Sequence, residues 1–187
     1  MNKAFDLSLF CGRFQHIHIG HENVINTALK LSNRILILVG SSQEVGTQRN
    51  PFSVDTRIEL IKAIYPEENV IVRPLADLTH ENDITEEWGR YVLDKFKFFS
   101  HKLPEIMVYG NDECRSRWFN PDDIKSITEV IISRSKVNIS ATQMREYLRI
   151  NDFDSWAEFA NPFIHKYYDR LRSELLSCEF YKSRGEI

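Results

Sequence analysis

GRFQHIHIGH, at residues 12–21, is the stretch that decides the fold, because it lies between an apolar run and a segment of helical pattern. Leu7–Cys11 predicts a buried strand, and Gly12 allows a sharp turn after it. Glu22–Leu31 then predicts a helix with its apolar residues on one face. The stretch therefore predicts a strand, a tight turn and a helix start in that order.

Two imidazoles, His18 and His21, lie at the start of that helix. Backbone N–H groups without a helical partner and the positive end of the helix dipole attract anions there. Gly20 carries no side chain that would keep a phosphate at a distance. The stretch therefore predicts a nucleotide site.

A second motif, ISATQMR at residues 139–145, begins the helix that the pattern predicts from Ser140 to Ile150. Ser140 would cap this helix, and Arg145 would project from its second turn. Together the motifs resemble H-x-G-H and I-S-x-T-x-x-R, the signatures of the nucleotidylyltransferase superfamily, which binds the triphosphate of ATP or CTP. The resemblance implies a Rossmann-like, doubly wound parallel sheet.

The rest of the chain alternates short apolar runs with helical patterns, which independently favours an α/β fold with a parallel sheet. Ligands of such sheets bind beyond the carboxyl ends of the strands, where Gly12, Gly40 and Gly110 would lie. C-terminal helices are expected as packing or oligomer surface. The expected strands are Arg34–Gly40, Val70–Val72, Ile106–Tyr109 and Val130–Ile132, and the further expected helices are Val54–Tyr65, Thr85–Phe99, Asp154–Phe159 and Pro162 to about Ser177.

Composition limits the class of protein. A chain of 187 residues, 42% of them hydrophobic, can bury one good core, which allows one domain or one domain with a helical appendage. With the resemblance, we expect one catalytic domain (1–150) and a helical extension (151–187) packed on it. A net charge of -3 argues against nucleic acid as a partner. Three widely spaced cysteines and the lack of a signal peptide or bilayer-spanning run predict a cytoplasmic protein that binds no membrane.

The loop between the motifs narrows the resemblance. Residues 40–52 read GSSQEVGTQRNPF, followed by Arg57. With the opening GRFQ and Trp88, this loop resembles the archaeal-type nicotinamide-nucleotide adenylyltransferases, which also occur fused to Nudix domains. The resemblance covers residues 5–150. The family usually has Pro-Phe where this chain has His16-Ile17. The region after Asn161 resembles the connector to a Nudix domain, so the chain is either a stand-alone transferase or half of a larger protein.

The resemblance implies transfer of the adenylyl group of ATP to nicotinamide mononucleotide, giving NAD and pyrophosphate. Mg²⁺ is expected, bound through the ATP phosphates and without a cage of acidic residues. A homo-oligomer is also expected. The implied catalytic residues are His18, His21 and Arg145; the implied ATP-binding residues are Gly12, Arg13, Phe14, Gly20, Gly110, Asn111, Ile139, Ser140 and Thr142; the implied mononucleotide-binding residues are Ser41, Gln43, Arg49 and Trp88.

Some positions stay open on the sequence alone. His16 has no family counterpart and is expected at the surface or behind the site. Arg57 is either an exposed or ion-paired charge or a ligand residue. Trp88 either stacks on the nicotinamide ring or packs in the core, and Trp118 and Trp156 are expected in the core or at an interface.

Other functions also stay open. The chain could be an adenylyl- or cytidylyltransferase for another phosphorylated acceptor, of the pantetheine phosphate or flavin mononucleotide type, or a non-catalytic nucleotide sensor. The letters HIGH also occur in class I aminoacyl-tRNA synthetases. That alternative is disfavoured because the chain is short and lacks a KMSKS-like motif.

Overall fold

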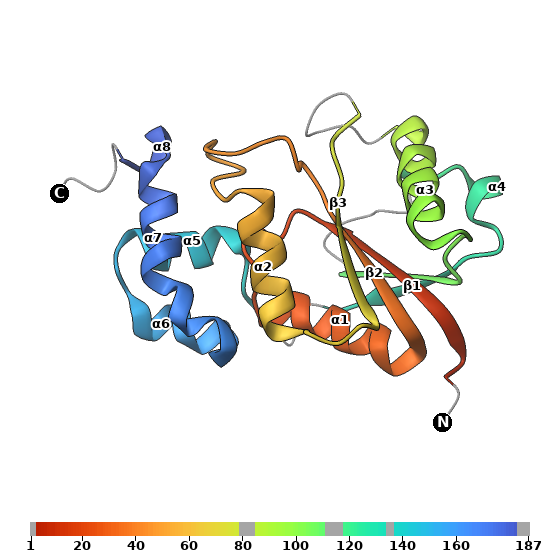
Figure 1. Cartoon of the computed structure of the whole chain (residues 1–187), viewed down its shortest axis with the longest axis horizontal. Helices are drawn as coiled ribbons and strands as arrows, with labels where there is room; N and C mark the ends of the chain where they lie inside the picture. The colour runs from red at the N-terminus through yellow and green to blue at the C-terminus, as the bar shows by residue number, and fades with distance from the viewer. Residues whose placement is uncertain (1–2, 79–84, 111–117, 134–136, 183–187) are drawn as a thin grey trace.

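The computed structural model describes residues 3–78, 85–110, 118–133 and 137–182. Its centre is a five-stranded sheet in the order β3-β2-β1-β4-β5, in which every neighbouring pair of strands is parallel (Figure 1). This order reverses direction between β1 and β4, as in doubly wound folds, so the predicted fold class is confirmed. The strands are β1 (Phe5–Gly12), β2 (Ser32–Val39), β3 (Val70–Pro74), β4 (Ile106–Gly110) and β5 (Thr128–Ile132).

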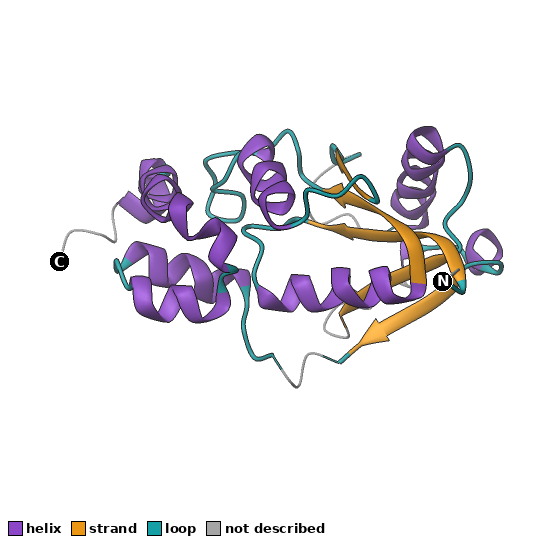
Figure 2. Ribbon diagram, turned by 60° about the horizontal axis from the view of Figure 1, so that its bottom comes forward, coloured by secondary structure: helices purple, strands orange, loops and turns teal. Residues whose placement is uncertain are grey.

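Helices cover both faces of the sheet and continue beyond it. Figure 2 shows α1 along one face, with α3 on the opposite side and the C-terminal helices grouped at one end. The helices are α1 (Ile19–Leu31), α2 (Val54–Ile64), α3 (Glu86–Ser100), α4 (Pro121–Ile124), α5 (Ala141–Arg149), α6 (Phe153–Phe159), the 3₁₀ helix η3 (Pro162–Tyr167), α7 (Tyr168–Ser177) and α8 (Glu179–Lys182).

Besides shifts of one or two residues at the ends of elements, three details differ from the sequence prediction. Helix α1 begins at Ile19, before the predicted Glu22, because the His18 side chain caps it. The single helix predicted from Pro162 is instead η3 followed by α7. The two one-turn helices α4 and α8 were not predicted, since four residues are too few to show a helical period.

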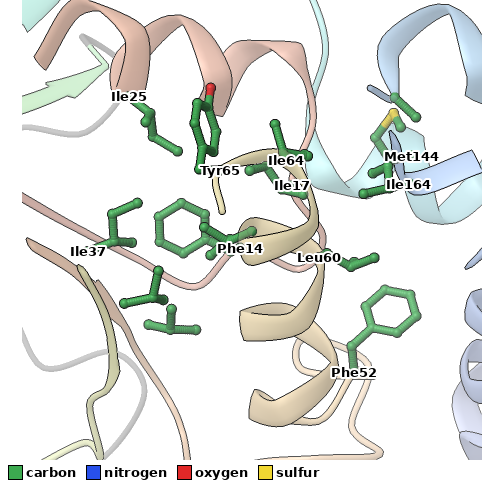
Figure 3. Close-up of a cluster of buried hydrophobic side chains, with 14 of the residues drawn as sticks. Phe14, Ile17, Ile25, Ile37, Phe52, Leu60, Ile64, Tyr65, Met144 and Ile164 are labelled. Carbon is green, nitrogen blue, oxygen red and sulfur yellow. The ribbon is translucent and has the colours of Figure 1, made fainter. Parts of the chain in front are cut away.

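Alternate side chains of each strand point to opposite faces and form two cores. Leu9, Leu36 and Leu38 pack with α3, whereas Phe10, Ile35 and Ile37 pack with α1 and α2. The second of these cores continues into the C-terminal helices. Figure 3 shows Met144 of α5 and Ile164 of η3 within the same cluster as Phe14, Ile25 and Leu60. The C-terminal helices therefore share the core of the sheet domain, while the boundary predicted at residue 150 stays a prediction.

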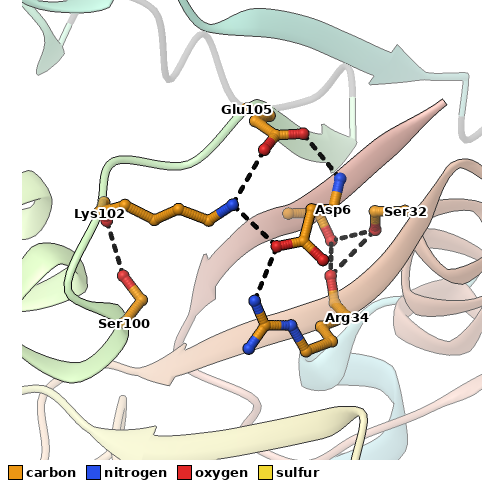
Figure 4. Close-up of polar contacts among 7 residues, drawn as sticks. Asp6, Ser32, Arg34, Ser100, Lys102 and Glu105 are labelled. Carbon is orange, nitrogen blue, oxygen red and sulfur yellow. Dashed lines mark hydrogen bonds and ion pairs between the residues drawn. The ribbon is translucent and has the colours of Figure 1, made fainter.

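A network of charges joins strands at the amino end of the sheet (Figure 4). The carboxylate of Asp6 pairs with Lys102 (2.8 Å) and Arg34 (2.7 Å), and Glu105 accepts from the backbone N–H of Asp6 (2.7 Å). Lys102 and Arg34 hold the pKa of Asp6 well below its usual range. Because these side chains are largely exposed, each pair contributes little to stability. The network lies at the opposite end of the sheet from the predicted site.

Candidate active site

Glycines mark the carboxyl edge of the sheet, as the sequence predicts. Gly12 is the last residue of β1, and Gly110 is the last residue of β4. Gly40 follows β2, and its N–H donates to the carbonyl oxygen of Gly12 (2.7 Å). The loop after β1 thus leaves the sheet beside the point where the strand order reverses, which is where ligands bind in doubly wound folds.

The imidazole pair lies at the start of α1. His18 is the N-cap, and its Nδ1 accepts from the N–H of Gly20 (3.1 Å). In the neutral ring this bond leaves Nε2 to carry the proton, so Nε2 can donate to an anion. The ring of His21 lies 4.0 Å from that of His18, measured between centroids. Two ring systems therefore meet at the positive end of a helix dipole.

Gly20 is required here for a reason that the sequence did not reveal. A Cβ at this position would lie 2.9 Å from two atoms of the His18 ring and 3.8 Å from Cγ2 of Ile139. The missing side chain therefore gives the capping imidazole its place. The same distance shows that Ile139 of the second motif lies beside Gly20 of the first motif. Close approach of a phosphate to Gly20 stays a prediction.

Arg145 joins the two motifs directly. Its guanidinium donates from Nη1 to the carbonyl oxygen of Gln15 (2.7 Å) and from Nη2 to Oγ1 of Thr142 (3.2 Å). Ser140 caps α5 by accepting from the N–H of Gln143 (3.2 Å), as predicted. Arg145 is buried on the second turn of that helix. The I-S-x-T-x-x-R segment is thus bonded to the loop that carries both histidines.

The loop of residues 40–52 is attached to the same place through Gln15. The side-chain amide of Gln15 donates to Oδ1 of Asn50 (3.2 Å) and to the carbonyl oxygen of Phe52 (3.3 Å), and its oxygen accepts from the N–H of Phe52 (3.0 Å). Gln15 and Asn50 are both buried. The GRFQ and NPF segments of the sequence are therefore two halves of one contact.

Arg57 is not an exposed charge, and no carboxylate of the described ranges forms an ion pair with it, which corrects that part of the sequence expectation. A ligand role for Arg57 stays a prediction. Its side chain is fully buried, and its guanidinium donates to the carbonyl oxygens of Arg13 (2.8 Å), Gly40 (2.7 Å) and Ser41 (3.1 Å). Burial lowers its pKa to about 10. One side chain of α2 thus fixes the loops that follow β1 and β2. The sequence held a signal for this role, because no acidic residue stands three or four positions away from Arg57.

Three of the predicted mononucleotide residues lie in the loop of residues 40–52, and the fourth, Trp88, lies on α3. Ser41 is buried, with a φ of 48°, and Gln43 forms two hydrogen bonds with Asp77 (3.0 and 3.1 Å). Arg49 is half-buried in the same loop as these two. Trp88 is 6% exposed on the first turn of α3, where its ring lies 5.4 Å from that of Tyr91. A role in binding the mononucleotide stays a prediction for each of the four.

The remaining predicted ATP residues mostly support the loop after β1. Phe14 is 1% exposed, and its ring packs 5.0 Å from that of His21. A Cβ on Gly12 would lie 3.1 Å from the Phe14 ring, so the glycine admits this side chain. Arg13 is half-buried. Asn111 lies outside the described residues.

His16 is fully buried, which excludes the surface and leaves the other expected place, behind the site. Its Nδ1 contacts the carbonyl oxygen of Ile17 (2.7 Å), and its Nε2 accepts from the indole N–H of Trp156 (2.9 Å). Burial lowers the pKa of His16 to about 4, with a further lowering by the charge of Arg145. The imidazole is therefore neutral at physiological pH. Trp156 lies in the core, as predicted.

Comparison with known proteins adds family information. The cytidylyltransferase-like family model matches residues 9–164. The nicotinamide-nucleotide adenylyltransferase of Saccharolobus solfataricus is 29% identical over 172 residues, covering 89% of this chain and 91% of that protein. The enzyme of the same name from Thermococcus kodakarensis is 24% identical over 96% of this chain and 93% of its own. These archaeal relatives confirm the resemblance drawn from the motifs.

A solved structure supports the fold. The bifunctional NMN adenylyltransferase/ADP ribose pyrophosphatase of Francisella tularensis, complexed with AMP and a manganese ion, superposes with a TM-score of 0.69 at 20% identity. The match covers 96% of this chain and 51% of the other, so this chain spans about half the length of that bifunctional protein. Within the described ranges, no helix is both long and hydrophobic enough to cross a bilayer.

Proposed function

This chain belongs to the cytidylyltransferase-like family, and we propose that it transfers the adenylyl group of ATP to nicotinamide mononucleotide, forming NAD and pyrophosphate. The observation that carries the proposal is the hydrogen bond from Arg145 to the Gln15 carbonyl, because it brings two distant motifs to one place. Two archaeal relatives named nicotinamide-nucleotide adenylyltransferase align over about nine-tenths of both chains, which supports nicotinamide mononucleotide as the acceptor.

The reaction joins two anions. A 5′-phosphate oxygen of the mononucleotide attacks the α-phosphorus of ATP, and the bond from that phosphorus to the bridging oxygen breaks as pyrophosphate leaves. The protein must position the two phosphates in line and stabilise the negative charge on the α-phosphoryl and leaving oxygens. His18 Nε2, His21 and the guanidinium of Arg145 are the donors that we assign to this task. Arg13 is assigned to the outer phosphates of ATP, and Arg49 to the mononucleotide phosphate.

Magnesium would enter with ATP. Across the described ranges, no cluster of three or more His, Cys, Asp or Glu side chains is arranged to hold a metal. We write the substrate as MgATP because Mg²⁺ is usually held by substrate phosphates and water oxygens in such sites. A cytoplasmic location and the absence of a nucleic-acid partner, both favoured by the sequence composition, belong to the same proposal, as does the homo-oligomeric state that the family resemblance implies.

The test is direct synthesis. We expect NAD when the purified chain is mixed with MgATP and nicotinamide mononucleotide and the products are separated by chromatography. Parallel reactions replace the acceptor with pantetheine phosphate or flavin mononucleotide, or replace ATP with CTP. Turnover of another pair in place of this one would overturn the choice of substrates, and no turnover of any pair would favour a nucleotide sensor.

A variant ties the activity to the site. His21→Ala should lower kcat by roughly a hundredfold, as the loss of one donor to a developing oxyanion does. His101→Asn is the matched control, because His101 is exposed at the end of α3 and has a φ of 63° that asparagine tolerates. A loss of less than a few-fold in the His21 variant would remove that residue from catalysis.

A further inference from the structure

The hydroxyl of Tyr181 is the meeting point of two segments that approach the site from different directions. Tyr181 belongs to α8 and is buried, with 7% of its surface exposed. Its oxygen accepts from Nε of Arg145 (2.9 Å) and donates to the carbonyl oxygen of Gln48 (2.8 Å). One hydroxyl near the C-terminal end of the described chain thus joins helix α5 to the loop of residues 40–52.

These two segments carry arginines with different expected tasks. Arg145 belongs to the motif expected at the triphosphate, and Arg49 follows Gln48 in the loop expected at the mononucleotide phosphate. The thiol of Cys178, at the start of the same C-terminal turn, donates to the carbonyl oxygen of Gly46 (2.9 Å). Residues 178–181 therefore hold the loop at Gly46 and Gln48, on both sides of Thr47 and directly before Arg49.

The bond to Tyr181 also determines which donors Arg145 can offer. A guanidinium has five N–H donors in a fixed plane. Among the residues that the structure describes, three of these donors are directed to Tyr181, Gln15 and Thr142. The plane of the guanidinium is thus fixed through all three of its nitrogens, and these bonds use three of its five N–H groups.

Packing alone does not require a tyrosine here. Phenylalanine would fill the same buried space, and the hydroxyl adds only the two hydrogen bonds that link Arg145 to Gln48. A phenolic oxygen that accepts and donates at once keeps both of its partners within hydrogen-bond distance of one atom. The hydroxyl is therefore suited to keeping the two segments in one arrangement.

We propose that Tyr181 is a positioning residue, whose hydroxyl holds Arg145 and the segment 46–49 so that the triphosphate and the mononucleotide phosphate are brought into line. This inference rests on the proposed function. It assigns a role at the site to α8, which follows residues 9–164, the part of the chain that the family model matches.

The decisive variant is Tyr181→Phe, which removes the hydroxyl and keeps the ring. The expected result is a fall of roughly tenfold in kcat/KM when either MgATP or nicotinamide mononucleotide is varied, the size of one hydrogen bond to a charged group. Titration calorimetry should give a weaker Kd for ATP in the absence of the acceptor. Tyr168→Phe is the matched control, because Tyr168 is equally buried in α7 and its hydroxyl donates to Asn151 (3.4 Å).

Thermal unfolding separates positioning from stability. Tyr181→Phe should lose more Tm than Tyr168→Phe, because it removes two hydrogen bonds, one of them from a charged group, whereas Tyr168→Phe removes one long bond. When both variants are assayed well below their Tm, only Tyr181→Phe should change the kinetic constants. Three outcomes would overturn the proposal: constants within twofold of the unmodified chain, an effect confined to one substrate, or an equal kinetic loss in Tyr168→Phe. Failure of the proposed function gives a different result, because the unmodified chain would then form no NAD. The calorimetric titration with ATP would in that case still show whether Tyr181→Phe weakens the Kd for ATP and Tyr168→Phe does not.

Discussion

Lowering the pH from 7 to 5 should destabilise this protein through His16. The buried imidazole has a pKa of about 4, whereas an exposed histidine has the usual value of 6.5. Protonation would place a charge in the core and remove the acceptor for the Trp156 indole N–H. Because the folded pKa is the lower one, the unfolded chain binds the extra proton first. The stabilisation is therefore complete above pH 6.5 and is lost as the pH falls toward 4.

The size of the effect follows from the shift. Each pH unit between the two values changes the free energy of unfolding by about 1.4 kcal/mol, so His16 should account for a loss of about 2 kcal/mol between pH 7 and pH 5. Further acidification to pH 4 should bring the total to about 3 kcal/mol. These losses are large relative to the stability of a typical domain.

Urea unfolding at pH 7, 6 and 5 measures this effect when the unmodified chain is compared with His16→Gln. Glutamine does not titrate, and its amide can still accept from Trp156 and donate to the Ile17 carbonyl. The carboxylates contribute equally to both proteins, so the difference between the two pH profiles isolates His16. Parallel profiles, with no steeper fall in the unmodified chain, would refute the reasoning.

Two further predictions concern Arg57 of α2 and Trp88 of α3. Arg57→Lys should lower the free energy of unfolding by about 2–4 kcal/mol, measured in urea, because an ammonium cannot reach all the carbonyls that the guanidinium joins. An unchanged unfolding midpoint would contradict this role. Trp88→Ala should raise KM for nicotinamide mononucleotide more than KM for ATP in steady-state assays, while equal changes in both would assign Trp88 to packing alone.

The parts of the fold that could be predicted are those written in local sequence. Parallel strands buried on both faces read as continuous apolar runs, as Arg34–Gly40 does, and the glycines at their ends indicate the edge where ligands bind. Ser140 could be identified as a cap because its hydroxyl serves its own helix. These signals depend on residues within a few positions of one another, so they needed no knowledge of the tertiary structure.

The residues that sequence reasoning misplaced or missed all depend on distant partners. His16 is paired with Trp156, and Tyr181 joins Arg145 to Gln48. In each case a polar group is buried against an element far along the chain, and the local pattern looks like ordinary surface or ordinary core. The sequence shows that His16-Ile17 replaces the family's Pro-Phe. The indole that binds His16 belongs to Trp156, which lies 140 positions away.

These long-range bonds give the C-terminal helices a part in the site itself. Trp156 supplies the donor for His16, Tyr181 fixes Arg145, and Glu174 accepts from the N–H of Ser53 (2.7 Å) at the start of α2. Removing any of these helices would leave buried polar groups without partners, at a cost of about 1–3 kcal/mol each and more for a charged one. Arg145 also donates to the carbonyl oxygen of Gln15, and Ser53 caps the helix that carries Arg57. Stability of the C-terminal helices and geometry of the candidate site are therefore coupled through shared hydrogen bonds.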